Sequence, residues 1–292
     1  MYAALAVALI DFTSHSARLI LTAWLILFYA IGDHLDGMQA KRTQTSSALG
    51  EFFDHFLDAF NNGILLFTVL TLFEVNNSTL IAFFLFASYL AHASMFYEQF
   101  KTGWLLFDKI GSLEAVLFAC ILLLAAGLLP VYDFLTTAVF LNLTVIEMLF
   151  SGISLGILFS FIKTLLRAHI TEPRFYMFCV LLSVTAILSV LIYSDVLVFL
   201  VITLYAGYYI GNLMRGHLAD GIGRFPDVFI PMVLGIGLIL NITGNPVFTY
   251  LVFLYFFVVI ARLAYATIFA LRKFWVWKNP VAENADLQVY TS

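Results

Sequence analysis

Four aspartates stand close together in a chain that otherwise carries few charges. Asp33 and Asp36 are three positions apart, and Asp54 and Asp58 are four positions apart. Either spacing places both members of a pair on one face of a helix. Four carboxylates gathered at the edge of apolar segments repel one another, so their ionised form requires a cation. Hard oxygen ligands of this kind suit Mg²⁺ or Mn²⁺, and the four carboxylates can bridge two such ions.

The residues between the two pairs favour a metal site over the alternative interpretation, a solvated helix end. A solvated helix end is the usual setting of a single exposed aspartate. Gly37 and Gly50 leave room for a ligand to approach the backbone. The adjacent cations Lys41 and Arg42 can neutralise phosphate oxygens. Together with the aspartates, these residues predict a site that binds a metal and a phosphate group.

The composition defines the setting of this site. The chain is 63% hydrophobic and only 11% charged, with a mean hydropathy of +1.01, whereas about a quarter of the residues of a soluble domain are charged. These values predict an all-α polytopic membrane protein. The formal net charge of −4 over 292 residues gives no indication of a nucleic-acid partner. Cys120 and Cys179 lie in apolar runs and are expected to pack as small hydrophobes.

Apolar runs near the length of about 20 residues that crosses a bilayer recur along the chain. They cover about 17–33, 51–74, 79–97, 113–131, 137–163, 173–193, 195–214, 227–243 and 247–271. A shorter apolar segment at the start resembles the end of an incomplete first span, and it lacks the basic region and cleavage site of a signal peptide. We therefore expect about ten transmembrane helices in one catalytic domain over residues 1–292, with a cytosolic tail at 275–292.

The positions of lysine and arginine predict the orientation. With the N-terminus in the cytosol, 12 of the 14 basic residues fall in cytosolic loops or in the tail, as the positive-inside rule requires. The aspartates then lie on the cytosolic face of a bacterial inner membrane or of the endoplasmic reticulum. Two ionisable residues, Glu147 and Arg262, fall well inside predicted spans, and their opposite charges predict an ion pair between helices.

The aspartate stretch also resembles a known family. Asp33-x2-Asp36-Gly37-x2-Ala40-Lys41-x8-Gly50-x3-Asp54-x3-Asp58 is similar to the signature of the CDP-alcohol phosphotransferases, also called class-I CDP-alcohol phosphatidyltransferases. Lys41 stands where that signature has arginine. The complete segment from Asp36 to Asp58, DGMQAKRTQTSSALGEFFDHFLD, resembles the choline/ethanolamine phosphotransferase branch. A count of ten spans also fits this branch. A looser similarity to this branch covers 97–103, Gly111 and Glu114.

This resemblance implies an activity and a set of residue roles. The activity is transfer of phosphocholine or phosphoethanolamine from a CDP-alcohol to a lipid hydroxyl such as that of diacylglycerol, with release of CMP. Asp58 is the implied general base, and Glu114 and His55 are further candidates for catalysis. The implied metal ligands are Asp33, Asp36, Asp54 and Asp58. The residues implied to line the nucleotide cleft or contact its phosphates are Gly37, Ala40, Lys41, Arg42 and Gly50.

Two other functions compete with this interpretation. Within the same superfamily, the donor could be CDP-diacylglycerol and the acceptor a small alcohol. From another class, a cation-coupled transporter would need an internal repeat and polar or broken helices near the middle of the bilayer, and the sequence has no such repeat. By analogy with related membrane enzymes, which are often dimers, a homodimer is a further expectation.

Overall fold

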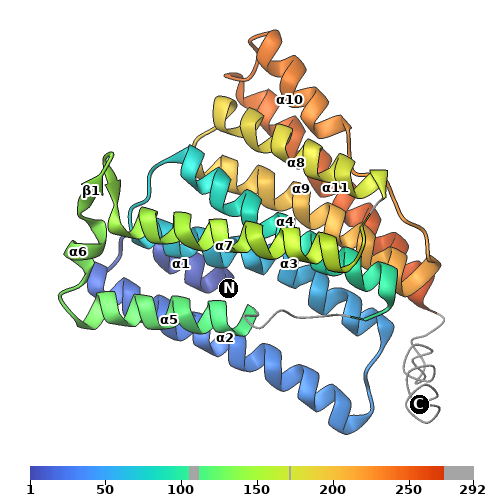
Figure 1. Cartoon of the computed structure of the whole chain (residues 1–292), viewed down its shortest axis with the longest axis horizontal. Helices are drawn as coiled ribbons and strands as arrows, with labels where there is room; N and C mark the ends of the chain where they lie inside the picture. The colour runs from blue at the N-terminus through green and yellow to red at the C-terminus, as the bar shows by residue number, and fades with distance from the viewer. Residues whose placement is uncertain (105–111, 171, 273–292) are drawn as a thin grey trace.

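The computed structural model describes residues 1–104, 112–170 and 172–272. The predicted tail at 275–292 and Gly111 lie outside these ranges. Helices dominate the described residues (Figure 1). Their bounds are α1 Tyr2–Leu9, α2 His15–Thr43, α3 Ala48–Leu72, α4 Ser78–Thr102, α5 Ser112–Leu128, α6 Tyr132–Thr136, α7 Val145–Arg167, α8 Pro173–Ile192, α9 Asp195–Arg215, the π-helical turn η1 Gly216–Asp220, α10 Phe229–Ile239 and α11 Pro246–Leu271.

The helices agree with the predicted membrane spans. Within the described ranges, seven helices are long and apolar enough to cross a bilayer, namely α2, α3, α4, α7, α8, α9 and α11. Two shorter apolar helices, α5 and α10, occupy two further predicted spans, and α1 is the short first segment. The prediction of an all-α polytopic membrane protein is therefore confirmed, with about ten apolar helices that differ in length.

One predicted span begins in the wrong place. Residues 137–144 were expected to open the span 137–163, but they form a short antiparallel hairpin of β1 (Ala138–Phe140) and β2 (Leu143–Thr144). Leu141 and Asn142 at its tip have φ values of 51° and 61°, and a two-residue hairpin turn of this type requires positive φ at both positions. High hydropathy alone did not distinguish this apolar hairpin from the start of a helix.

A capping box sets the true start of α7. The Glu147 N–H donates to Thr144 Oγ1 at 3.3 Å, and the Thr144 N–H donates to the Glu147 carboxylate at 2.7 Å. Glu147 thus lies in the first turn of a helix instead of mid-span. The predicted ion pair with Arg262 is wrong, because the Glu147 carboxylate bonds to Thr144 and Arg262 makes no ion pair with any described residue.

Helix α9 is the most buried of the spanning helices and packs against α3, α4, α8 and α11. Two glycines allow its close approach to α3, since a Cβ atom at Gly207 would meet the ring of Phe60 and one at Gly211 would meet the ring of Phe56. Helix α2 instead packs mainly along α5, and the two lie side by side at the lower edge of Figure 1. The two aspartate pairs therefore come from helices that pack against different parts of the bundle: α3 against α9, and α2 against α5.

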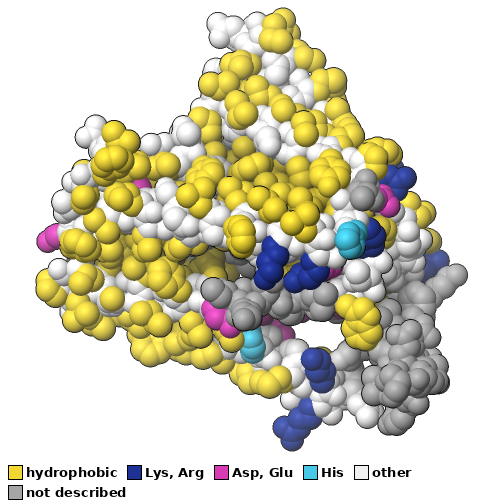
Figure 2. All heavy atoms as spheres, in the orientation of Figure 1, with side chains coloured by type: hydrophobic (Ala, Val, Ile, Leu, Met, Phe, Trp, Pro, Cys, Tyr) yellow, Lys and Arg dark blue, Asp and Glu magenta, His cyan; other side chains and the backbone are white. Residues whose placement is uncertain are grey.

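The helix ends that carry most basic residues meet at one end of the bundle. Lys101 at the end of α4 donates to the His169 carbonyl after α7 at 2.7 Å, and Arg174 at the start of α8 donates to the Gly223 carbonyl after η1 at 2.8 Å. In Figure 2 the visible lysine and arginine side chains gather toward the right of the view. These two contacts tie the end of α4 to the end of α7, and the start of α8 to the segment after η1.

Candidate metal and nucleotide site

Capping residues at both ends of a short turn reverse the chain between the two aspartate pairs. Gln44 ends α2 in the left-handed conformation, and the Thr45 N–H donates to the Ala40 carbonyl at 2.9 Å. Ser47 then begins α3, because its Oγ accepts the Gly50 N–H at 3.1 Å. The end of α2 and the start of α3 are thus held at the same end of the molecule.

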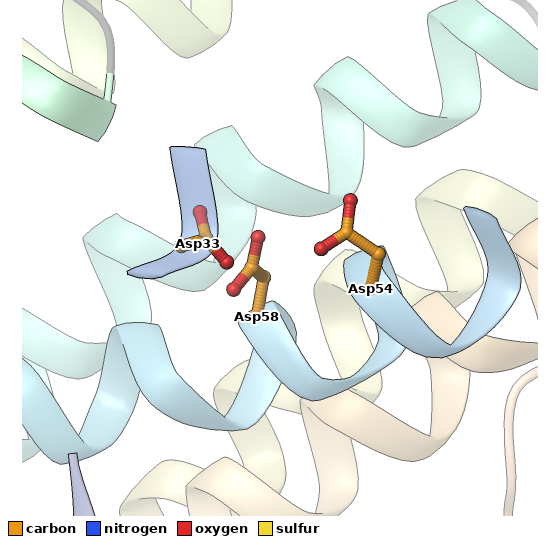
Figure 3. Close-up of side chains that lie close together, drawn as sticks. All are labelled: Asp33, Asp54 and Asp58. Atoms are coloured by element: carbon orange, nitrogen blue, oxygen red, sulfur yellow. The ribbon is translucent and has the colours of Figure 1, made fainter. Parts of the chain in front are cut away.

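Three of the four predicted aspartates converge across this turn. Asp33 comes from α2, and Asp54 and Asp58 come from successive turns of α3. Each offers one carboxylate oxygen, and these three oxygens all lie within 4.8 Å of one another. Figure 3 shows Asp58 between the other two side chains, with the Asp33 carboxylate close to it. The i, i+4 spacing on α3 and the crossing of α2 together create this group.

Asp36 does not join this group among the described residues. Helix α2 packs along α5 and makes little contact with α3, so the two aspartate-bearing helices diverge toward the turn. Asp36 is exposed one turn further along α2. It remains close enough to act electrostatically on Asp33 and Asp54. The convergence of all four carboxylates expected from the short connection is therefore limited to three.

Two residues that were not predicted hold Asp58 in place. The Tyr29 hydroxyl on α2 donates to Asp58 Oδ1 at 2.6 Å, and the same hydroxyl accepts from Asn61 Nδ2 at 2.9 Å. Tyr29 lies one helical turn before Asp33, and Asn61 lies three residues after Asp58, so both share a helix face with a site aspartate. In the sequence, this spacing of about one helical turn from a site aspartate is the feature that could have identified Tyr29 and Asn61.

The three carboxylates fit a small divalent cation. Mg²⁺ and Mn²⁺ prefer oxygen ligands, and ligands on opposite sides of Mg²⁺ lie about 4.2 Å apart because each bond is about 2.1 Å long. Three ligands of one octahedral ion include adjacent pairs about 3.0 Å apart, so oxygens that lie within 4.8 Å of one another must draw together by up to about 1.8 Å to bind the same ion. Without a cation, three adjacent carboxylates repel one another. The donor set therefore suits a metal ion.

The other two candidates for catalysis, His55 and Glu114, come from α3 and α5. The His55 ring packs against Phe96 of α4 with centroids 5.4 Å apart, and its buried Nδ1 has no hydrogen-bond partner in the described part of the chain. Glu114 is exposed in the first turn of α5. The thiol of Cys120 on α5 donates to the Ala23 carbonyl on α2, and extending this antiparallel register by six residues places Glu114 near the level of Tyr29.

The candidates for nucleotide binding surround the turn. Lys41 and Arg42 are exposed in the last turn of α2, and Ala40 is partly buried beside them. Among the described residues, a Cβ atom at Gly37 would meet nothing within 4 Å, and one at Gly50 would meet only Ser47 Oγ at 3.3 Å. Packing within the chain therefore does not require glycine at Gly37, which leaves open space beside the carboxylates.

The second stretch that resembles the branch packs next to the start of α3. Gln99 Nε2 donates to Glu51 Oε1 at 3.3 Å. Glu98 is 1% exposed and forms a two-pronged ion pair with Arg167 of α7, with distances of 2.9 Å and 2.6 Å. This stretch thus ties α4 to α3 and α7 at the same end of the bundle as the aspartates.

Comparison with known proteins gives relatives for the N-terminal part of the chain. Cholinephosphotransferase 1 of Saccharomyces cerevisiae is 30% identical over 113 residues, which are 36% of this chain and 29% of that protein. Choline/ethanolaminephosphotransferase 1 of the same yeast is 30% identical over 117 residues, again 36% and 29% of the two chains. An uncharacterised class-I CDP-alcohol phosphatidyltransferase family protein of Schizosaccharomyces pombe is 38% identical over 92 residues, 28% of this chain and 23% of that protein.

Each of these alignments spans less than a third of the relative's length. A family model described as CDP-alcohol phosphatidyltransferase matches a longer stretch, residues 1–146, which is half of the chain. The matched range contains helices α1 to α6 and therefore the complete carboxylate group. The chain belongs to the CDP-alcohol phosphatidyltransferase family.

Proposed function

We propose that this protein transfers a phospho-alcohol, phosphocholine or phosphoethanolamine, from a CDP-alcohol to a lipid hydroxyl such as that of diacylglycerol, in phospholipid biosynthesis. The observation that carries the proposal is the convergence of Asp33, Asp54 and Asp58 from two helices, beside open space at Gly37. The similarity to the two yeast phosphotransferases supports this choice of substrates within the family.

In the proposed site, Asp33, Asp54 and Asp58 would hold one or two Mg²⁺ or Mn²⁺ ions, and Asp36, which lies outside this group, would join as a ligand when a metal binds. The bound metal would neutralise the negative charge of the pyrophosphate and of the departing CMP. Gly37, Ala40 and Gly50 line the nucleotide cleft. Lys41 and Arg42 are close enough in sequence to share the task of pairing with phosphate oxygens.

In the reaction, the lipid hydroxyl oxygen forms a bond to the phosphorus that carries the alcohol, and the bond from that phosphorus to the bridging oxygen of CMP breaks. Asp58 accepts the hydroxyl proton, and its hydrogen bond from Tyr29 Oη leaves the second carboxylate oxygen for this role. Glu114 and His55 are the alternative bases. Catalysis rests mainly on positioning and on electrostatic stabilisation.

The substrates would meet at the membrane surface. The CDP-alcohol arrives from the cytosol, on which side we place the carboxylates because most basic residues gather at the same end. The lipid acceptor enters sideways from the bilayer. The whole chain, residues 1–292, serves as one catalytic unit in this proposal, and it functions as a homodimer by analogy with related membrane enzymes.

A substrate panel tests the proposal. Purified protein is assayed for CMP release with Mg²⁺, in one series with CDP-choline or CDP-ethanolamine plus diacylglycerol, and in another with CDP-diacylglycerol plus small alcohols. We expect turnover in the first series, and activity confined to the second would replace our donor assignment with the reverse one. Asp58→Asn should abolish turnover while CDP-alcohol binding is largely retained.

The matched control is Asp195→Asn, the same chemical change at the start of α9, where the carboxylate accepts a hydrogen bond from Ser78. This variant should keep its activity, because the residue lies outside the carboxylate group. Full activity of Asp58→Asn would contradict the assigned role of Asp58 as base and ligand.

A further inference from the structure

A polar cavity lies between α9 and α11, and none of the three converging aspartates lines it. It has a volume of about 330 Å³, within the range of about 300–1,000 Å³ that is typical of small-ligand sites. Three arginines from different segments line this cavity. They are Arg215 at the end of α9, Arg224 after η1 and Arg262 on α11. The remaining lining residues are Tyr208, Asn212, Tyr255, Val259 and Leu263.

The arginines outnumber the carboxylates that face them. Arg224 forms an ion pair with Asp220, and Arg215 Nε lies 3.5 Å from the same carboxylate. Arg215 Nε is buried and makes no hydrogen bond within the described ranges, so its distance to Asp220 is an ionic contact only. Arg262 makes no hydrogen bond or ion pair with any residue in the described part of the chain. Among the described residues, Asp220 is thus the one carboxylate in contact with any of these three guanidinium groups.

The position of Arg262 indicates what kind of anion the cavity takes. Arg262 lies nine residues before the end of α11 at Leu271, which is roughly 13 Å along the helix. An arginine at that depth in a membrane is costly unless an anion pairs with it. On the same helix, Val258 and Tyr265 are 52% and 71% exposed, as suits side chains that face lipid. An anion that pairs with Arg262 would therefore lie beside apolar side chains exposed on the same helix.

We propose that this cavity binds the phosphate group of a membrane phospholipid, whose acyl chains lie against the exposed apolar side chains of α11. Arginine suits phosphate because its planar guanidinium can donate two parallel hydrogen bonds to the oxygens. A free phosphate ion or a nucleotide carries the same chemistry, but neither has an apolar part to place beside Val258 and Tyr265. The inference does not depend on the proposed reaction.

Lipid binding by the full chain tests this inference. Protein in a neutral detergent is titrated with dioleoylphosphatidylglycerol, and native mass spectrometry counts the lipids retained. Dioleoylglycerol, which has the same chains without phosphate, and inorganic phosphate form the comparison series. We expect one retained phosphatidylglycerol per chain, and an apparent Kd about tenfold higher in Arg262→Gln, because a charge-assisted hydrogen bond is lost. Arg224→Gln should weaken binding in the same direction.

The matched control is Arg272→Gln, which removes the same charge one residue beyond α11. Its guanidinium lies over the Phe269 ring outside the cavity, so lipid retention should not change. Thermal unfolding without added lipid verifies that each variant is folded. Retention by Arg262→Gln and Arg224→Gln equal to wild type would overturn the proposal. Retention of dioleoylglycerol that falls in Arg262→Gln as much as retention of the phospholipid does, or displacement of the phospholipid by an equal concentration of inorganic phosphate, would also overturn it.

Discussion

Tyr29 tests the carboxylate site most directly, because it touches the group without being a candidate ligand. Tyr29→Phe removes the hydroxyl that donates to Asp58 Oδ1 at 2.6 Å and leaves the ring in place. Asp58 then becomes free to turn away from the neighbouring carboxylates when no metal is bound. The metal must pull it back on binding, so we expect a weaker affinity for Mn²⁺ or Mg²⁺ in this variant.

The geometry gives the size of the effect. Two unit charges 4.8 Å apart repel by about 0.9 kcal/mol in water and about 3.5 kcal/mol at an effective dielectric constant of about 20. The site is partly exposed, with Asp54 exposed and the other two half-buried, so relief of about 1.5–2 kcal/mol is a reasonable intermediate value. At about 1.4 kcal/mol for each factor of ten, the Kd for the metal should rise about ten- to thirtyfold.

The measurement is a titration of the purified protein with Mn²⁺, in which electron paramagnetic resonance reports the free ion and no nucleotide is present. Tyr176→Phe is the matched control, since it loses a hydroxyl that donates to the Ile170 carbonyl at 2.7 Å and leaves the carboxylates untouched. A Kd in Tyr29→Phe within twofold of wild type, together with lost binding in Asp58→Asn, would refute the positioning role of Tyr29.

Two further predictions concern packing and charge. Gly37→Ala should not lower the unfolding temperature, because the added methyl meets no described atom of the chain within 4 Å and alanine favours a helix interior. It should weaken CDP-alcohol binding, because the methyl would intrude on the proposed nucleotide cleft. Gly63→Ala should instead destabilise by about 1–3 kcal/mol, because its methyl would collide with Tyr89. Equal unfolding temperatures for the two variants would contradict this. Arg167→Met should lower stability by about 3 kcal/mol, since it leaves the buried Glu98 carboxylate uncompensated. Adding Glu98→Gln should restore most of that loss, and no restoration in the double variant would argue against the pair.

Local patterns in the sequence predicted much of the fold and part of the site. Hydropathy located the apolar helices, because each must present about 20 apolar residues to lipid. It misplaced the start of α7, since the hairpin at 137–144 is also apolar, and the Thr144-x-x-Glu147 capping pattern was the better signal. The spacing of Asp54 and Asp58 was sufficient to place both on one face of α3, because that relation lies within a single helix.

The sequence by itself thus determined the membrane class, the helical aspartate pairs and the family resemblance, because all three depend on composition and on short-range spacing. Only the tertiary structure decided which carboxylates meet. Helix α2 packs along α5 and diverges from α3, so Asp33 joins Asp54 and Asp58 while Asp36 stays outside. The tertiary structure also brought Tyr29 to Asp58 and assembled the arginine cavity between α9 and α11. Such contacts join residues far apart in sequence, and they depend on helix packing angles that no local pattern encodes.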